Sequence, residues 1–323
     1  MKKAISLICI LLVLALLPYL PSCQKAEDSE KITILCTLFP MYDWVKNIVG
    51  DREDVEVSLL IKNGTDPHSY QPTAADIMAI SNCDMIVYIG GESDKWVQEA
   101  LERAKNADIA KIDLSEMEGM TLREVSSSSH SHHEDDHEHH HGAFDEHLWL
   151  SLANAKAATL GLSSAICAID SENARLYKDN TAKYIEKLDS LDEKYADAVK
   201  SVEEKARFLL FADRFPFVYL LSEYGVEYSA PFDGCTTDVN ADFGTVLELI
   251  KEADTHEVAY IAVTETSDKA LANTVAGSAK NDIEILVMNS LQSVTASQLA
   301  EGISYLGVME KNLGTLKKAL GAR

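Results

Sequence analysis

The chain has 323 residues, of which 46% are hydrophobic, so it is long enough for two domains with apolar cores of ordinary size. Asp and Glu number 52 against 29 Lys and Arg, and the formal net charge is -23. This balance excludes a nucleic-acid binder that needs clustered cations, and 6 cysteines are too few for a disulfide scaffold.

The first 22 residues have the pattern of a lipoprotein signal peptide. A pair of lysines precedes an apolar stretch at 5–17, and the sequence LPSC at 20–23 resembles the bacterial lipobox. We therefore expect the mature chain to begin at a lipidated Cys23 and to continue as a polar tether over 23–30. A plain secretory signal with a chance cysteine is the alternative. The apolar stretch is short for a membrane span, and no later segment is expected to cross the bilayer.

After the tether, short apolar runs alternate with amphipathic stretches. Four runs have the composition of buried strands: 31–37, 55–61, 84–90 and 109–113. Three helical patterns follow the first three of them, at 42–50, 73–81 and 93–106. Thr73 is placed to cap the second helix because Asp76 follows three residues later. This alternation predicts a first lobe, 31–170, in which helices flank a parallel sheet.

A low-complexity tract interrupts the first lobe at 126–142. Residues 126–141, SSSSHSHHEDDHEHHH, hold seven of the ten histidines and four acidic residues. Such a tract does not build a core, so we expect a disordered or loosely held loop. Imidazole and carboxylate are ligands that zinc, copper, nickel and cobalt prefer, which predicts metal collection of modest affinity. A solvated loop without a role is the alternative.

The middle of the chain predicts one long helix. Residues 171–202 contain no Gly and no Pro, and their apolar residues recur at helical spacing over roughly 48 Å. Because these positions do not keep a heptad, we interpret 171–203 as a rigid strut between lobes rather than as a coiled coil.

The second lobe, 204–323, repeats the strand pattern of the first. Its expected strands are 207–212, 226–230, 258–264 and 284–288, and a helix from about 296 to 320 closes the chain. The predicted fold is therefore α/β, with two lobes that each hold a parallel β-sheet flanked by helices, joined by one long rigid helix.

Two motifs carry a family resemblance. DPHSYQP at 66–72 follows the second expected strand, and EHLWLS at 146–151 follows the His-rich tract. With LFP at 38–40, these motifs make the chain similar to the metal-specific solute-binding lipoproteins of ABC importers, the cluster A-I family, over essentially the whole mature chain. The resemblance implies that His68 and His147 bind a metal in a cleft between the lobes. A His-rich loop is typical of the zinc members.

The second lobe departs from the pattern of those zinc members. They carry a Phe-His-Asp run after the first strand of this lobe, and here Ala212 stands in the place of the histidine. Asp213 and Glu265 are equal candidates for the missing ligand, and Cys235 follows them. Each also has a structural interpretation: an ion pair for Asp213, hydrogen bonds that orient neighbours for Glu265, and a small apolar loop residue for Cys235.

The resemblance implies a function without catalysis. We expect a monomeric, extracytoplasmic receptor, lipid-anchored at a bacterial cell surface or in the periplasm, that captures Zn(II) and delivers it to the permease of an ABC importer. A manganese receptor of the same family, a passive metal buffer or adhesin, and a secreted zinc hydrolase are the alternatives. The hydrolase would need an open coordination position, a general base and a substrate pocket.

Overall fold

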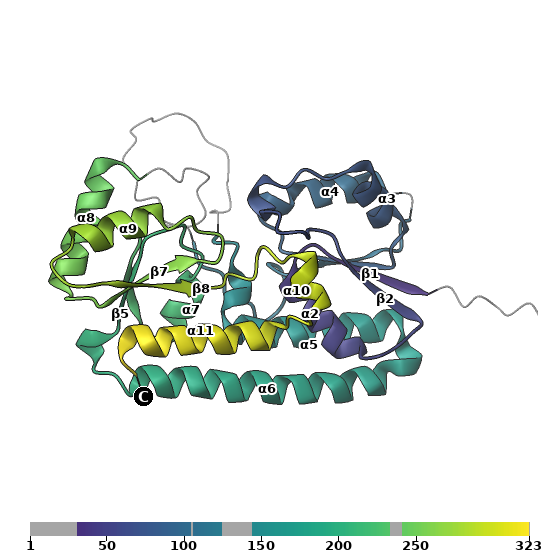
Figure 1. The fold of residues 1–323 in the computed structure, drawn as a ribbon. Helices are drawn as coiled ribbons and strands as arrows, with labels where there is room; N and C mark the ends of the chain where they lie inside the picture. Colours follow the sequence, from purple (N-terminus) through teal and green to yellow (C-terminus); the bar gives the residue numbers. More distant parts are fainter. Residues whose placement is uncertain (1–30, 105, 125–143, 233–240, 323) are drawn as a thin grey trace, which may run out of the picture. The chain divides into compact units, whose positions relative to one another are not determined.

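The computed structural model describes residues 31–104, 106–124, 144–232 and 241–322. Residues from Ile32 onward form one compact unit, and the polypeptide path through it is drawn in Figure 1. The expected signal peptide, the lipidated Cys23, the tether, the His-rich tract and Cys235 lie outside the described residues.

The first sheet holds four parallel strands in the order β2-β1-β3-β4. Their bounds are β1 (Ile32–Cys36), β2 (Val55–Leu59), β3 (Met85–Tyr88) and β4 (Ala110–Asp113). The helices of this lobe are α2 (Phe39–Val49), α3 (Ala74–Asn82), α4 (Lys95–Glu102) and α5 (Leu152–Ile169). Ile34 of β1 pairs with Val57 on one side and Met85 on the other. The predicted capping box of α3, Thr73 with Asp76, is present.

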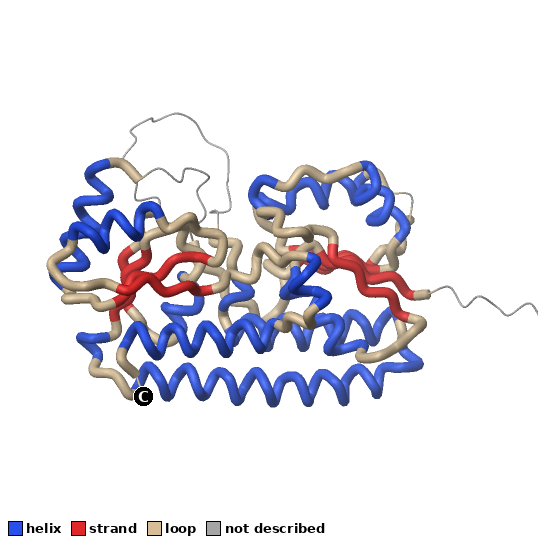
Figure 2. The backbone as a smooth tube through the Cα atoms, in the orientation of Figure 1, coloured by secondary structure: helices blue, strands red, loops and turns tan. Residues whose placement is uncertain are grey.

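The second sheet repeats this order as β6-β5-β7-β8, again with all strands parallel. Figure 2 shows the strands of both sheets in red and the surrounding helices in blue. Its strands are β5 (Phe208–Phe211), β6 (Glu227–Ser229), β7 (Tyr260–Thr264) and β8 (Glu284–Met288). The helices of this lobe are α7 (Val218–Glu223), α8 (Phe243–Thr255) and α9 (Ala270–Ser278). All eight strands lie within their predicted ranges. The carboxyl ends of β5, β7 and β8 meet at one edge, which is where α/β proteins hold ligands.

One long helix packs against both lobes. α6 (Ala174–Lys200) begins after a 3-10 turn at Ser171–Asn173, so the predicted helix is confirmed. It contacts α2 and α5 of the first lobe and α11 (Tyr305–Leu320) of the second, and Figure 1 shows it passing below both sheets. The hydroxyl of Tyr195 on α6 donates to the Met309 carbonyl on α11 at 2.7 Å. Packing and hydrogen bonding therefore tie this helix to both lobes.

The prediction of one closing helix over 296–320 is wrong, because the structure has two helices in this range. The chain forms α10 (Ala296–Ala300), leaves helical geometry at Gly302, and begins again as α11. Gly302 has a φ of 77°, a left-handed conformation that favours glycine. The side chain of Ser304 then accepts a hydrogen bond from the Gly307 amide and caps α11.

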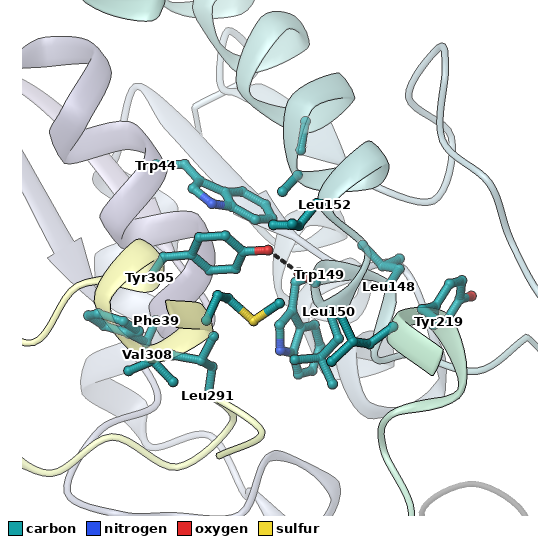
Figure 3. Packing of buried hydrophobic residues seen from close by; sticks show 14 of the residues in the cluster. Phe39, Trp44, Leu148, Trp149, Leu150, Leu152, Tyr219, Leu291, Tyr305 and Val308 are labelled. Carbon is teal, nitrogen blue, oxygen red and sulfur yellow. Dashed lines mark hydrogen bonds between the residues drawn. The ribbon is translucent and has the colours of Figure 1, made fainter. Parts of the chain in front are cut away.

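One apolar core contains residues of both lobes, and part of it is drawn in Figure 3. Trp44 of α2 packs edge-on against Tyr305, with ring centroids 5.3 Å apart. The Tyr305 hydroxyl donates to the Trp149 carbonyl at 2.7 Å, and the Trp149 indole donates to the Ser290 carbonyl at 2.8 Å. The segment around Trp149 is therefore fixed by contacts from both lobes.

Helix α5 is part of this core. Among the described helices it alone is long and apolar enough to cross a membrane by length and composition, although no later segment was expected to do so. It packs against α6, and its residues Ala155, Leu162 and Ile166 are buried in the core. These contacts are those of a core helix.

Asp43 is a buried carboxylate in the same core, 8% exposed. Burial raises its pKa to about 6 from 3.8, against the lowering effect of hydrogen bonds from the Tyr305 amide and the Tyr184 hydroxyl, each 3.2 Å long. The folded state thus holds this proton more tightly than the unfolded state. Its contribution to stability is full below about pH 3.8 and is lost as the pH rises to about 6.

We predict that Asp43→Asn stabilises the protein at neutral pH. Two pKa units correspond to about 3 kcal/mol, and we expect a gain of about 1–2 kcal/mol at pH 7.5 because the neutral amide keeps an acceptor in place. Urea unfolding at pH 7.5 and pH 4.5 measures this. The gain in the free energy of unfolding should be smaller at pH 4.5 than at pH 7.5. An equal gain at both pH values would contradict a raised pKa of Asp43.

Candidate metal site

His68 lies in a short 3-10 turn, Pro67–Ser69, that follows β2. The Asp66 side chain caps this turn by accepting from the His68 amide at 3.0 Å. On the imidazole, Nδ1 lies 2.8 Å from the Ser93 hydroxyl and 3.7 Å from Oε2 of Glu146. The other ring nitrogen, Nε2, is buried and has no hydrogen-bond partner. A buried polar atom without a partner is costly, so this nitrogen is available to a ligand.

His147 lies directly before a second 3-10 turn, Leu148–Leu150, and is 1% exposed. Its Nδ1 lies 2.9 Å from Oδ1 of Asp145, and the same oxygen accepts from the His147 amide at 2.9 Å. Its Nε2 lies 3.2 Å from Oε1 of Gln292 in the second lobe. These contacts on both ring nitrogens fix the orientation of the imidazole.

The two imidazoles face each other, with ring centroids 5.4 Å apart. Each has Nδ1 beside a carboxylate, Asp145 for His147 and Glu146 for His68. Metal-binding histidines commonly donate the N–H that does not face the metal to a carboxylate, which fixes the ring and raises its basicity. In both rings Nε2 is the nitrogen that does not lie beside a carboxylate.

Glu146 organises the His68 side of the pair. Its carboxylate accepts from the Ser93 amide at 3.0 Å and from the Ser93 hydroxyl, which in turn contacts His68. A Cβ on Gly91 would collide with this carboxylate, so a glycine is required there. Ser93 is a site residue that sequence reasoning missed, because only the fold brings it to the EHLWLS motif.

Gln292 was also missed. It follows β8, in a turn where Leu291 has a φ of 62° and is fully buried. Glu265 holds this turn: its carboxylate accepts from the Ser290 amide and hydroxyl, both at 2.8 Å. The sequence offered one indication of this role. Gln292 follows a predicted parallel strand, and ligands bind at the carboxyl ends of such strands.

The candidate ligands of the second lobe, Asp213 and Glu265, make hydrogen bonds within that lobe. Asp213 accepts from the Thr264 amide at 3.1 Å and from the Thr264 hydroxyl. Ala212, expected to mark a vacant ligand position, belongs to an apolar cluster and is 2% exposed. Arg214 is the residue of this segment that contacts the first lobe, with Nη1 2.5 Å from Oδ2 of Asp66. Ala212 directly follows strand β5, and its methyl side chain has no atom that could bind a metal.

Among the described residues, no group of three or more His, Cys, Asp or Glu side chains is arranged to hold a metal. The structure brings His68 and His147 together, and it uses Asp213 and Glu265 in hydrogen bonds within the second lobe. The His-rich tract contains the His-Glu-x-x-His spacing at 133–137 and 137–141. That spacing indicates a metalloprotease only on a helix, and these residues lie outside the described ranges.

Two parallel-sheet lobes with a buried histidine pair define a metal-binding protein of the solute-receptor class. The family model described as the zinc-uptake complex component A, periplasmic, matches residues 34–319. The chain belongs to this family.

Individual relatives agree with this assignment. The chain is 32% identical to the high-affinity zinc uptake system protein ZnuA of Bacillus subtilis (strain 168), over 93% of this chain and 91% of that protein. It is 31% identical to the zinc-binding lipoprotein AdcA of Streptococcus pneumoniae, of which it spans 58%. The structure of the Zn(II)-bound ZnuA-like domain of S. pneumoniae AdcA superimposes with a TM-score of 0.72 at 29% identity, covering 90% of this chain and 99% of that one.

We predict that Glu146→Gln weakens zinc binding about 10- to 100-fold, because the amide no longer provides the negative charge beside His68. Glu92→Gln is the matched control, since the Glu92 side chain is 72% exposed and pairs with Lys95 at the surface. Zinc titration against a competing chelator measures both variants. Equal affinities for the two would show that Glu146 does not act on the site.

Proposed function

We propose that this chain is an extracytoplasmic zinc receptor that delivers Zn(II) to the permease of an ABC importer. The observation that carries the proposal is the His68–His147 pair, in which Nε2 of His68 is buried without a partner and both Nδ1 atoms lie beside carboxylates. The family is described as a periplasmic zinc-uptake component, and its relatives ZnuA and AdcA are named for zinc.

The proposed ligands are Nε2 of His68, Nε2 of His147 and Oε1 of Gln292. Imidazole nitrogen favours zinc over manganese, which prefers sites rich in oxygen, so the donor set supports zinc. In this proposal Asp213 and Glu265 are not ligands. They hold the chain after β5 and β8 so that the second lobe presents Gln292 to the histidines.

The proposed ligands come from both lobes, and this suggests how zinc is released. Both histidines belong to the first lobe and Gln292 to the second, so a small separation of the lobes removes one donor. Two further contacts join the same loops: the Gly64 amide donates to the Val294 carbonyl at 3.1 Å, and the Ser293 hydroxyl donates to the Thr65 carbonyl at 3.3 Å. We propose that docking on the permease breaks these contacts and frees the ion.

The remaining parts of the proposal concern the whole chain. It acts as a monomeric, non-enzymatic receptor, held at the membrane by a lipid on Cys23. The His-rich tract at 126–142 serves as an auxiliary collector that passes zinc to the tight site. The relative AdcA of S. pneumoniae is called a lipoprotein, which supports the lipid anchor.

The decisive test replaces each histidine. We expect His68→Ala and His147→Ala to lower zinc affinity at least about 100-fold, since each removes a ligand rather than a supporting group. His256→Ala is the matched control, because His256 stacks on Phe208 with ring centroids 3.7 Å apart and pairs with Glu252.

Competitive titration measures affinity, and zinc uptake by a strain that lacks the gene measures delivery. Wild-type affinity in both histidine variants would overturn the site. Tight binding without rescue of uptake would favour the passive metal buffer.

A further inference from the structure

A cavity of about 650 Å³ lies beside the histidine pair, at the carboxyl ends of the strands of the second sheet. Gln292 and Asp66 both line it. Gln292 reaches His147, and Asp66 caps the turn that carries His68. Since a water molecule occupies about 30 Å³ in the liquid, this volume greatly exceeds what one ion and its water need.

The coordination offered by the proposed site is incomplete on the side of this cavity. His68, His147 and Gln292 provide three neutral donors, and zinc sites are almost always four-coordinate. The described residues add no third His, Cys, Asp or Glu to the pair. A fourth donor therefore comes from outside these residues, and the cavity offers the room for it.

Arg214 gives the cavity a built anchor for a carboxylate. Arg214 lines the cavity and its Nη1 pairs with Asp66, whereas its Nε is buried and has no hydrogen-bond partner. A guanidinium presents its N–H groups in a planar fork that fits a carboxylate, and a buried donor left unpaired is costly. This orphaned donor favours a ligand that brings its own acceptor.

Carboxylates also line the cavity, so a plain anion is not the best match. Asp213 and Asp268 lie in its wall together with the hydroxyls of Thr266 and Ser267. A positive group on a ligand would be attracted to Asp213 and Asp268. A carboxylate on the same ligand would be attracted to Arg214. A free α-amino acid carries both charges within one small molecule.

We propose that the cavity takes a free amino acid with a metal-binding side chain, which completes the coordination of the bound zinc, so that the receptor carries the ion together with this molecule. The inference rests on the proposed zinc site. A neutral side-chain nitrogen, such as that of L-histidine, replaces a water on zinc by a dative bond. The α-carboxylate pairs with Arg214, and no electron transfer takes place.

Equilibrium dialysis with radiolabelled L-histidine tests the proposal, with zinc content measured in the same samples. Zinc-saturated wild type should retain about one L-histidine per zinc, and the zinc-free protein should retain none. Imidazole lacks the carboxylate and should bind at least about 10-fold more weakly. Absence of retained L-histidine from zinc-saturated protein at millimolar concentration overturns the proposal.

Arg214 variants locate the ligand. Arg214→Gln should lower L-histidine retained per bound zinc about 10- to 100-fold, and Arg214→Lys, which keeps the charge beside Asp66, should have an intermediate effect. Arg175→Gln is the control, because Arg175 is 96% exposed on α6. Wild-type retention in Arg214→Gln would also overturn the proposal. If the zinc site itself is wrong, the zinc content of the protein will not fall in His68→Ala. That result differs from normal zinc binding without retained L-histidine, which contradicts only the amino-acid proposal.

Discussion

The site depends on one constraint, that each imidazole of the pair is held through Nδ1 beside a carboxylate. For His147 the carboxylate is Asp145, two residues earlier, which also accepts from the His147 amide. For His68 it is Glu146, which comes from a different loop and acts with Ser93. In the proposed site both rings bind the ion through Nε2, and the contacts at Nδ1 hold the rings in place before the ion arrives.

The fold supplies this constraint by burying the segment that carries it. Residues 145–152 belong to the first lobe, yet the Trp149 indole donates to Ser290 of the second lobe and its carbonyl accepts from Tyr305. The same turn after β8 contains Ser290 and Gln292, so packing and the third proposed ligand are coupled. A separation of the lobes large enough to remove Gln292 must therefore disturb the hydrogen bond at Trp149.

Periodicity predicted the framework well because burial repeats along each strand and helix. The eight strands, α6 and the capping box of α3 follow from local patterns. The motifs indicated His68 and His147 as candidate ligands, and the structure places these two rings close together. Gln292 and Ser93 could not be identified in this way, because their contacts join residues that are distant in sequence. Gln292 is 145 residues from His147, and Ser93 is 53 residues from Glu146. The burial of Ala212 could not be predicted from its motif position either, because it depends on the apolar cluster that forms around the end of β5.

The most direct test of this account is a crystal structure of the zinc-loaded protein with anomalous scattering recorded at the zinc edge. The account predicts one strong peak about 2.0–2.1 Å from Nε2 of both His68 and His147, with Oε1 of Gln292 as a further neighbour. A peak bonded to Nδ1 of either ring, or one centred on Asp213 and Glu265 away from the histidines, would contradict it.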